Sequence, residues 1–199
     1  MGDVGAWLPF FLALLLVLGW YLSYSAARLD RLHHRVESAR AALDTQLVRR
    51  AAAAAELAGL LPLAAGRPLA EAAAAALKAG LSESVPADGR PGGPTPPLSE
   101  VESELTRALH RAVVAVPRPV SDSGPGDFGS ADAELMATLR SLNRSCERVQ
   151  LARRFHNDAV AQSLRMRAKR IIRWTRLAGH APEPRMIDLD DRTPPGLLP

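Results

Sequence analysis

The sequence predicts an all-α protein in which a single N-terminal transmembrane helix continues into an antiparallel helical bundle, or coiled coil, of about four helices. Three observations lead to this prediction. No charged residue lies between Asp3 and Arg28. In the rest of the chain, apolar residues recur at alternating spacings of three and four, as in heptad repeats. No stretch alternates apolar and polar residues with a period of two, so nothing indicates a β-strand.

The first element is an apolar segment of 18 residues, 7–24, with the sequence WLPFFLALLLVLGWYLSY. As a helix it spans about 27 Å at about 1.5 Å per residue, close to the roughly 30 Å of a bilayer's hydrocarbon core. Aromatic residues stand at both of its ends, the two levels where such rings settle in membranes. The residues assigned to the span are Trp7, Leu8, Phe10, Leu14, Leu18, Trp20, Tyr21 and Tyr24. Residues 1–27 are therefore expected to form a membrane anchor.

A cleaved signal peptide is the alternative for this segment. Signal peptides begin with basic residues and end at a small-residue cleavage site. Here no Lys or Arg precedes the apolar core, and residues 23–27 offer only a weak site. Basic residues follow the segment, namely Arg28, Arg31, Arg35 and Arg40. The positive-inside rule then predicts a single-pass protein of a bacterial plasma membrane, with its N-terminus outside and its helical domain in the cytoplasm.

The composition agrees with this location. Arg far outnumbers Lys and alanine runs are long, which suggests a high-GC, actinobacterial-type genome. The single cysteine, Cys146, cannot form an internal disulfide, as expected of a cytoplasmic domain. We expect its thiol to be a small core group in an apolar stripe.

The soluble helices are expected within residues 28–179. The first continues out of the membrane and ends near Gly59 and Pro62. Its apolar seam begins with Leu29, Leu32, Val36, Ala39 and Leu43. The second helix is expected over 68–79, from a proline suited to a first turn to the glycine that follows. A Pro- and Gly-rich loop near 81–98 comes next.

The third helix is expected to begin at Ser99, with Ser99 and Glu102 forming a capping box, and to end before Pro117. A second loop near 117–130 precedes a fourth helix over 130–177, about 72 Å long. Residues 180–199 lack hydrophobic periodicity, so we expect a mostly disordered tail.

Three segments resemble the LemA family. The tail LAGHAPEPRMIDLD is similar to the family's C-terminal ending. The family's pattern Val-x-x-Ala, then Asp-x-Gln-Leu-x-x-Arg-Arg, is matched by Val36, Ala39, Asp44, Gln46, Leu47, Arg49 and Arg50. The segment LARRFHNDAV is similar to the family's Ala-Arg-x-x-Tyr-Asn-x-x-Val. It matches at Ala152, Arg153, Asn157 and Val160, with His156 in place of the tyrosine.

The chain departs from that family in several places. Ser163 and Leu164 stand where the family has a second Tyr-Asn, and residues 187–188 are Ile-Asp where it usually has Phe-Glu. The alanine-rich second helix and the proline-rich loop match weakly, which indicates a divergent member. The resemblance implies a membrane-anchored helical coiled coil without known catalysis, from a family linked to envelope or membrane-remodelling processes.

No pattern of residues indicates catalysis, a metal or a cofactor. His33 and His34 are adjacent, so on a helix they point about 100° apart and cannot chelate one ion together. The other histidines are isolated, and no HExxH or cysteine pair is present. The glycine-rich stretch at 89–94 lacks the strand before it and the Lys-Ser/Thr after it that a phosphate loop needs. We therefore expect no enzyme activity.

A polar set on the two long helices is the first candidate site. Its members are Asp44, Gln46, Arg49, Arg50, Arg153, Asn157 and Asp158. If the long helices run antiparallel, these side chains are able to meet in the bundle. Such a cluster would either fix the register of the helices or bind a ligand or partner.

A basic set is the second candidate site. Its members are Arg28, Arg31, Arg35, Arg165, Arg167, Lys169, Arg170, Arg173 and Arg176. An antiparallel fourth helix would return its basic end to the level of Arg28, so that both clusters face the anionic cytoplasmic leaflet. A merely solvated surface is the alternative. Nucleic acid is not favoured, because the net charge is only +4 and no reader motif is present.

These features together predict a non-enzymatic scaffold at the membrane that assembles protein partners, whose identity the sequence does not give, or copies of itself. The basic ends are expected to bind anionic lipid. The alternative is a lipid or small-ligand sensor that uses a polar site in the bundle core, and a polar cavity near Asn157 would favour it.

Overall fold

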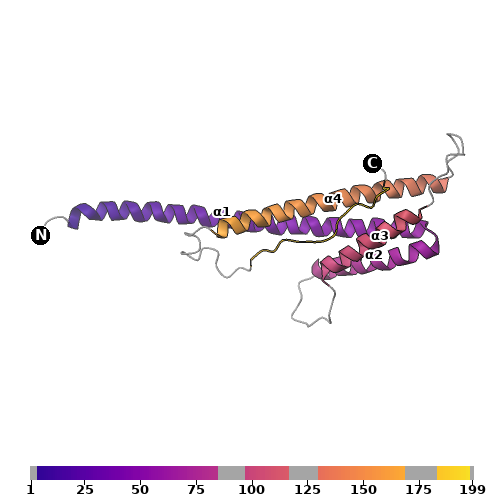
Figure 1. Ribbon diagram of the computed structural model, residues 1–199. Coiled ribbons are helices and arrows are strands. Elements are labelled where there is room, and N and C mark those ends of the chain that lie inside the picture. The colour runs from indigo at the N-terminus through magenta and orange to yellow at the C-terminus, as the bar shows by residue number, and fades with distance from the viewer. Residues whose placement is uncertain (1–3, 85–96, 117–129, 169–182, 198–199) are drawn as a thin grey trace. The chain divides into compact units, whose positions relative to one another are not determined.

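The structure is a computed structural model that describes residues 4–84, 97–116, 130–168 and 183–197. Four helices account for most of these residues (Figure 1). They are α1 (Val4–Leu60), α2 (Leu63–Ser84), α3 (Leu98–Ala115) and α4 (Ser130–Arg167). The described ranges contain no β-strand. The all-α prediction is confirmed, and the apolar N-terminal helix runs without a break into the first helix of the bundle.

The helix α2 is longer than predicted at both ends. It starts at Leu63 because the carbonyl of Pro62 accepts hydrogen bonds from the backbone N–H groups of Ala65 and Gly66, each at 2.9 Å. Pro68 therefore lies inside the helix. Gly80 does not end it, so the predicted loop is wrong for residues 81–84.

The start of α3 also differs from the prediction. The helix begins at Leu98, its N-cap is Pro97, and within the described part of the chain no side chain caps it. The predicted capping box is wrong because Glu102 turns into the core. The remaining loop residues, 85–96 and 117–129, and the predicted end of the fourth helix at 177 lie outside the described residues.

The chain divides into two compact units. The first unit is Met1–Ala39 with His156–Met186, and the second is Arg40–Phe155 with Ile187–Pro199. Both long helices contribute to both units. The predicted boundary at residue 28 therefore does not separate the compact units.

The first unit carries the apolar part of α1. This helix contains a stretch long and apolar enough to cross a membrane, with a mean hydropathy of 1.8. Large side chains between Trp7 and Tyr24 are exposed, Trp20 by as much as 71%. Beyond this stretch, Val36 of α1 packs against Ala159 and Val160 of α4. The two helices are thus joined by a small apolar core within this unit.

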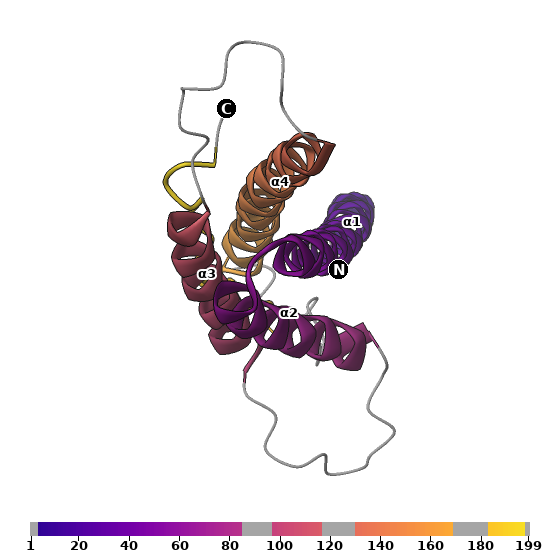
Figure 2. The same ribbon diagram turned by 90° about the vertical axis from the view of Figure 1, so that its right-hand side faces the viewer.

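The second unit contains the main hydrophobic core. The helices α2 and α3 pack side by side with opposite chain directions (Figure 1), and the view turned by 90° shows that they cross at an angle (Figure 2). Their alanines and leucines share one cluster with the end of α1 and the beginning of α4, with Leu57, Leu69, Leu105 and Leu142 fully buried. Neighbouring positions along α1 and α4 form a smaller cluster of Leu43, Leu47 and Val149.

The C-terminal residues differ from the expected disordered tail. Residues 187–197, here called the strap, form no helix or strand, but their side chains enter both clusters of the second unit. Leu189 packs with Leu43 and Val149, and Leu197 joins the main core. The prediction of a disordered tail is therefore wrong for these residues. Hydrophobic periodicity does not reveal this kind of order. A few isolated apolar residues are enough to hold an irregular segment against the packed helices.

Candidate functional site

A buried ion pair joins α1 to α3 in the second unit. The guanidinium of Arg50 donates a hydrogen bond to the carboxylate of Glu102, and each side chain is only 1% exposed. Arg50 also donates to the hydroxyl of Thr106 and to the carbonyl of Glu102, both at 3.4 Å. Among the described residues, no group accepts a hydrogen bond from the buried Nε of Arg50. Charges taken this far out of water require such partners, because their desolvation is costly.

The ionisation of Glu102 reflects two opposing effects. Burial raises the pKa of this carboxyl above its usual value, and the neighbouring Arg50 lowers it. Burial is the larger effect, so the net shift of the pKa is upward. Glu102 therefore holds a proton more readily in the folded chain than in the unfolded chain.

The strap is held by three side chains from one face of α3. The hydroxyl of Thr106 donates to the carbonyl of Asp190 at 2.6 Å, and the hydroxyl of Ser103 accepts from the N–H of Asp190 at 3.4 Å. The ring Nε2 of His110 lies 3.4 Å from the carbonyl of Arg192. Thr106 also contacts Arg50, so the strap and the buried ion pair share one polar network.

The opposite side of the strap is held by α4. Arg153 forms a bidentate ion pair with the carboxylate of Asp191, with Nε–Oδ2 at 2.7 Å and Nη2–Oδ1 at 3.1 Å. The amide of Gln150 donates to the carbonyl of Asp191 at 2.8 Å and to the hydroxyl of Thr193 at 3.0 Å. Asp191 is 8% exposed, so this pair is largely shielded from water. Arg–carboxylate pairs with two parallel hydrogen bonds are among the stronger polar contacts in proteins.

The predicted polar set is therefore not a single cluster. Arg50 is buried as expected, but its partners are Glu102 and Thr106 of α3, and Arg153 pairs with the strap. Asp44 pairs with Arg40 one turn away, and no residue that the structure describes donates a hydrogen bond to the buried side-chain oxygen of Gln46. Arg49 is exposed in the second unit. Asn157, half-buried, and Asp158, exposed, belong to the first unit.

The partners of Arg50 and Arg153 were missed in the sequence. Glu102 and Leu109 are one heptad apart on α3, and both are buried. Glu102 is a carboxylate at an apolar seam position, which is a sign of a buried ion pair. The spacing of Ser99 and Glu102 also fits a capping box, so the sequence supports two explanations for this glutamate. No sequence pattern near Asp191 or Gln150 indicates that they meet, because their contact joins segments far apart in the chain.

Cys146 and His156 are two further buried side chains that can carry chemistry. The thiol of Cys146 is buried in the main cluster as predicted, and burial raises its pKa. His156 is also buried, with its ring Nε2 3.4 Å from the carbonyl of Arg185 in the first unit. A thiol with a raised pKa is a poor nucleophile, so Cys146 has a packing role.

The basic set falls partly within the first unit. Arg28, Arg31 and Arg35 are exposed on α1, and Arg35 donates to the side-chain oxygen of Gln162 on α4 at 3.4 Å. Arg165, which is exposed, and Arg167, which is half-buried, lie three and five residues beyond Gln162 on α4. The contact of Val36 with Val160 sets an antiparallel register that brings these residues level with the segment around Arg31. The other predicted members, Lys169, Arg170, Arg173 and Arg176, lie outside the described residues.

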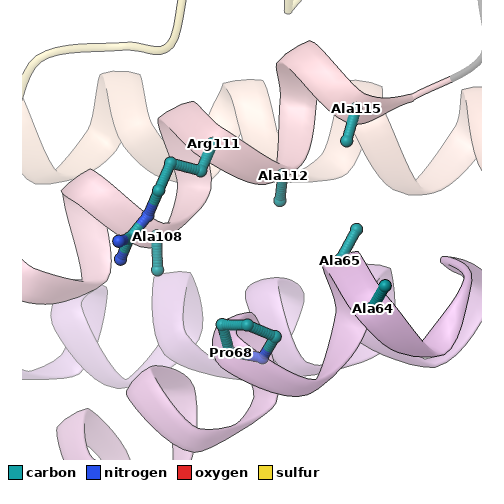
Figure 3. Close-up of a pocket in the computed structure, with 7 residues that line it drawn as sticks. All are labelled: Ala64, Ala65, Pro68, Ala108, Arg111, Ala112 and Ala115. Carbon is teal, nitrogen blue, oxygen red and sulfur yellow. The ribbon is translucent and has the colours of Figure 1, made fainter.

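A cavity of about 380 Å³ lies between α2 and α3. The close-up shows alanine methyl groups of the two helices facing each other across it, with Pro68 on one side and Arg111 at one end (Figure 3). The alanines are Ala64, Ala65, Ala108, Ala112 and Ala115. Its walls are mostly apolar and do not include Asn157, so it does not supply the polar site that the sensor alternative needs.

The two histidines of α1, one half-buried and one exposed, lie beside carboxylates. His33 is 3.2 Å from Glu37, and His34 lies 3.3 Å from Glu37 and 3.8 Å from Asp30. Among the described residues, no group of three His, Cys, Asp or Glu side chains is placed to hold a metal ion. These contacts are ordinary surface pairs within one helix.

Comparison of the chain with protein-family models, with curated proteins and with solved structures gives no match. The resemblance to the LemA family therefore stays a prediction from the motifs alone. The features that bear on function are the apolar helix, the basic cluster and the polar network of the strap.

Proposed function

We propose that this protein is a single-pass, membrane-anchored helical scaffold without enzyme activity. In this proposal α1 crosses a bacterial plasma membrane with its N-terminus outside, and the helical domain lies at the cytoplasmic face. The LemA-like motifs agree with such a role. The proposal concerns the whole chain, since the anchor and the first helix of the domain are one continuous helix.

The observation that carries the proposal is the position of the arginines in the first unit. Arg28, Arg31 and Arg35 follow the apolar stretch directly on α1, and the antiparallel register places Arg165 on α4 at a similar level. An apolar helix flanked by cations on one side has the charge pattern of a span whose basic end faces anionic headgroups. Each cation near such a surface contributes about 1 kcal/mol, and this attraction is screened by salt.

The experiment is a titration of the full-length protein in detergent micelles with a short-chain anionic lipid, followed by native mass spectrometry. A triple variant, Arg28→Gln, Arg31→Gln and Arg165→Gln, is expected to lower lipid affinity by roughly fivefold per arginine at low salt. The matched control replaces three exposed arginines of the second unit, Arg140, Arg144 and Arg148, by Gln.

The control variant loses the same charge and should bind lipid as the unmodified protein does. Equal losses in the two variants would show that only net charge matters. Equal binding of anionic and zwitterionic lipid by the unmodified protein would also contradict the proposal.

A further inference from the structure

The strap is bound in the manner of an extended peptide ligand. Ser103, Thr106 and His110 are spaced three and four residues apart, so they form one stripe along α3. Gln150 and Arg153 form a second stripe on α4. The side chains of these two stripes contact the strap at Asp190, Asp191, Arg192 and Thr193. The two helices thus form a groove whose polar side chains all converge on one short segment.

The contacts define which segment the groove accepts. Hydrogen bonds to the main chain at residues 190–192 require an extended backbone but no particular side chain. Selectivity comes from the bidentate pair of Arg153 with Asp191, and from Leu189, which is 7% exposed among the leucines of α1. The ligand class is an extended acidic peptide of the form Leu-Asp-Asp-x-Thr.

We propose that this α3–α4 groove is a peptide-binding site that also accepts the strap of a second copy of the chain, so that copies associate by exchanging straps. A second copy carries the fitting sequence, and exchange replaces each contact by an identical one. For this reason swapping of an identical element is a low-cost route to dimers. Confinement of two copies in one bilayer raises their effective concentration further.

This inference gives the proposed scaffold a means of self-association, and it depends on the proposed function only for its membrane setting. The groove itself can be tested in detergent without anionic lipid. Failure of the lipid titration and failure of the tests below are therefore distinguishable.

The first test mixes two variants of the full-length protein, one with Ser103→Cys and the other with Asp190→Cys. The hydroxyl of Ser103 accepts a hydrogen bond from the backbone N–H of Asp190 at 3.4 Å, so cysteines at these two positions lie close together where a strap occupies a groove. With a mild oxidant, the mixture in micelles should give a covalent dimer on a non-reducing gel. The control mixture replaces Ser103→Cys by Ala137→Cys, which is exposed on α4. Equal dimer yield from the two mixtures would overturn the exchange.

The second test measures binding of a fluorescent peptide with the sequence of residues 183–199 to the full-length protein by anisotropy. The chain's own strap competes, so Asp191→Asn in the protein should strengthen peptide binding several-fold. In the Asp191→Asn background, Arg153→Gln should then weaken it by roughly tenfold or more, because the carboxylate of the peptide loses its partner while the chain's own strap no longer has that pair to lose. The opposite signs separate a binding site from a general loss of folding. If neither variant changes peptide binding, or if both weaken it, the groove is not a peptide site.

A double variant, Ser103→Cys with Asp190→Cys in one chain, keeps the test decisive if Asp191→Asn fails to fold. Oxidation should lock the strap in its own groove and abolish peptide binding, and reduction should restore it. Equal peptide binding by the oxidised and reduced forms would overturn the proposal.

Discussion

At the scale of single residues, Arg50 is a charged side chain that is buried, with only 1% of its surface exposed. A guanidinium cannot lose its proton at any ordinary pH, so a buried arginine needs its acceptors. Arg50 has the carboxylate of Glu102, the hydroxyl of Thr106 and one carbonyl. It follows that the fold should tolerate the loss of Arg50 better than the loss of Glu102.

Replacing Glu102 by Gln is expected to lower the free energy of unfolding by about 3–5 kcal/mol, because it leaves a buried charge without its counter-ion. Chemical denaturation of the full-length protein in detergent measures the change. Glu71→Gln is the control, because it breaks an Arg–Glu pair whose side chains are 75% and 67% exposed. That pair should contribute less than about 1 kcal/mol. Similar effects of the two substitutions would contradict the assignment of a buried pair.

Replacing Arg50 by Met should make stability depend more strongly on pH. Burial raises the pKa of Glu102 and Arg50 opposes this, so without Arg50 the pKa rises further. An acid whose pKa is raised by folding binds its proton more tightly in the folded state, so its contribution to stability falls as pH rises above the unfolded value.

The stability difference between the unmodified protein and Arg50→Met should therefore be larger at pH 8 than at pH 5. Denaturation curves of both proteins at the two values provide the check. A difference that stays constant, or one that shrinks toward pH 8, would show that Glu102 does not carry this proton.

The burial of Arg50 could be predicted from the sequence, whereas its partners could not. Leu29, Val36, Leu43, Arg50 and Leu57 are spaced seven residues apart on α1, and all five are buried. The strict heptad thus places the charge in the core. A heptad pattern does not predict which helix packs on this face of α1. The groups that accept hydrogen bonds from Arg50 belong to α3 and not, as expected, to α4.

At the scale of helices, the corner between α1 and α2 depends on one glycine. A Cβ atom on Gly66 would lie 2.4 Å from the carbonyl oxygen of Ala58, which is closer than any real contact. The backbones of the two helices therefore approach each other where only hydrogen fits. Gly59, at the end of α1, has nothing within 4 Å of such an atom.

Replacing Gly66 by Ala should lower the free energy of unfolding by about 1–3 kcal/mol, since backbone must move to accept the methyl group. Gly59→Ala should be neutral or stabilise by up to about 1 kcal/mol, because alanine favours the helix. Thermal unfolding followed by circular dichroism would rank the two variants. If Gly59→Ala lowered stability more than Gly66→Ala, the close approach of the α1 and α2 backbones at Gly66 would be contradicted.

The helix seams are the part of the fold that the sequence predicts best. The apolar positions expected on α1, such as Leu43, and on α4, such as Leu142, are buried. The ends of α2 and the strap were predicted poorly. A proline carbonyl can start a helix early, and a strap depends on a groove that exists only after the helices have packed.

At the scale of the whole molecule, the chain consists of two compact units, and both long helices contribute to each. The first unit has the exposed apolar surface and the basic cluster, and the second has the main core and the strap. In this account, the two functions of a membrane scaffold lie in different units. Attachment belongs to the first and association to the second.

The membrane anchor is the feature on which this account depends most, and one measurement tests it directly. The full-length chain is produced in a bacterium, and its intact mass and protease sensitivity are measured in spheroplasts and in inverted membrane vesicles. We expect the complete chain in the membrane fraction, with α2, α3 and α4 cut only in inverted vesicles. A shorter chain that lacks the apolar segment, or cleavage of these helices from the outer side, would contradict a cytoplasmic scaffold held by an uncleaved anchor.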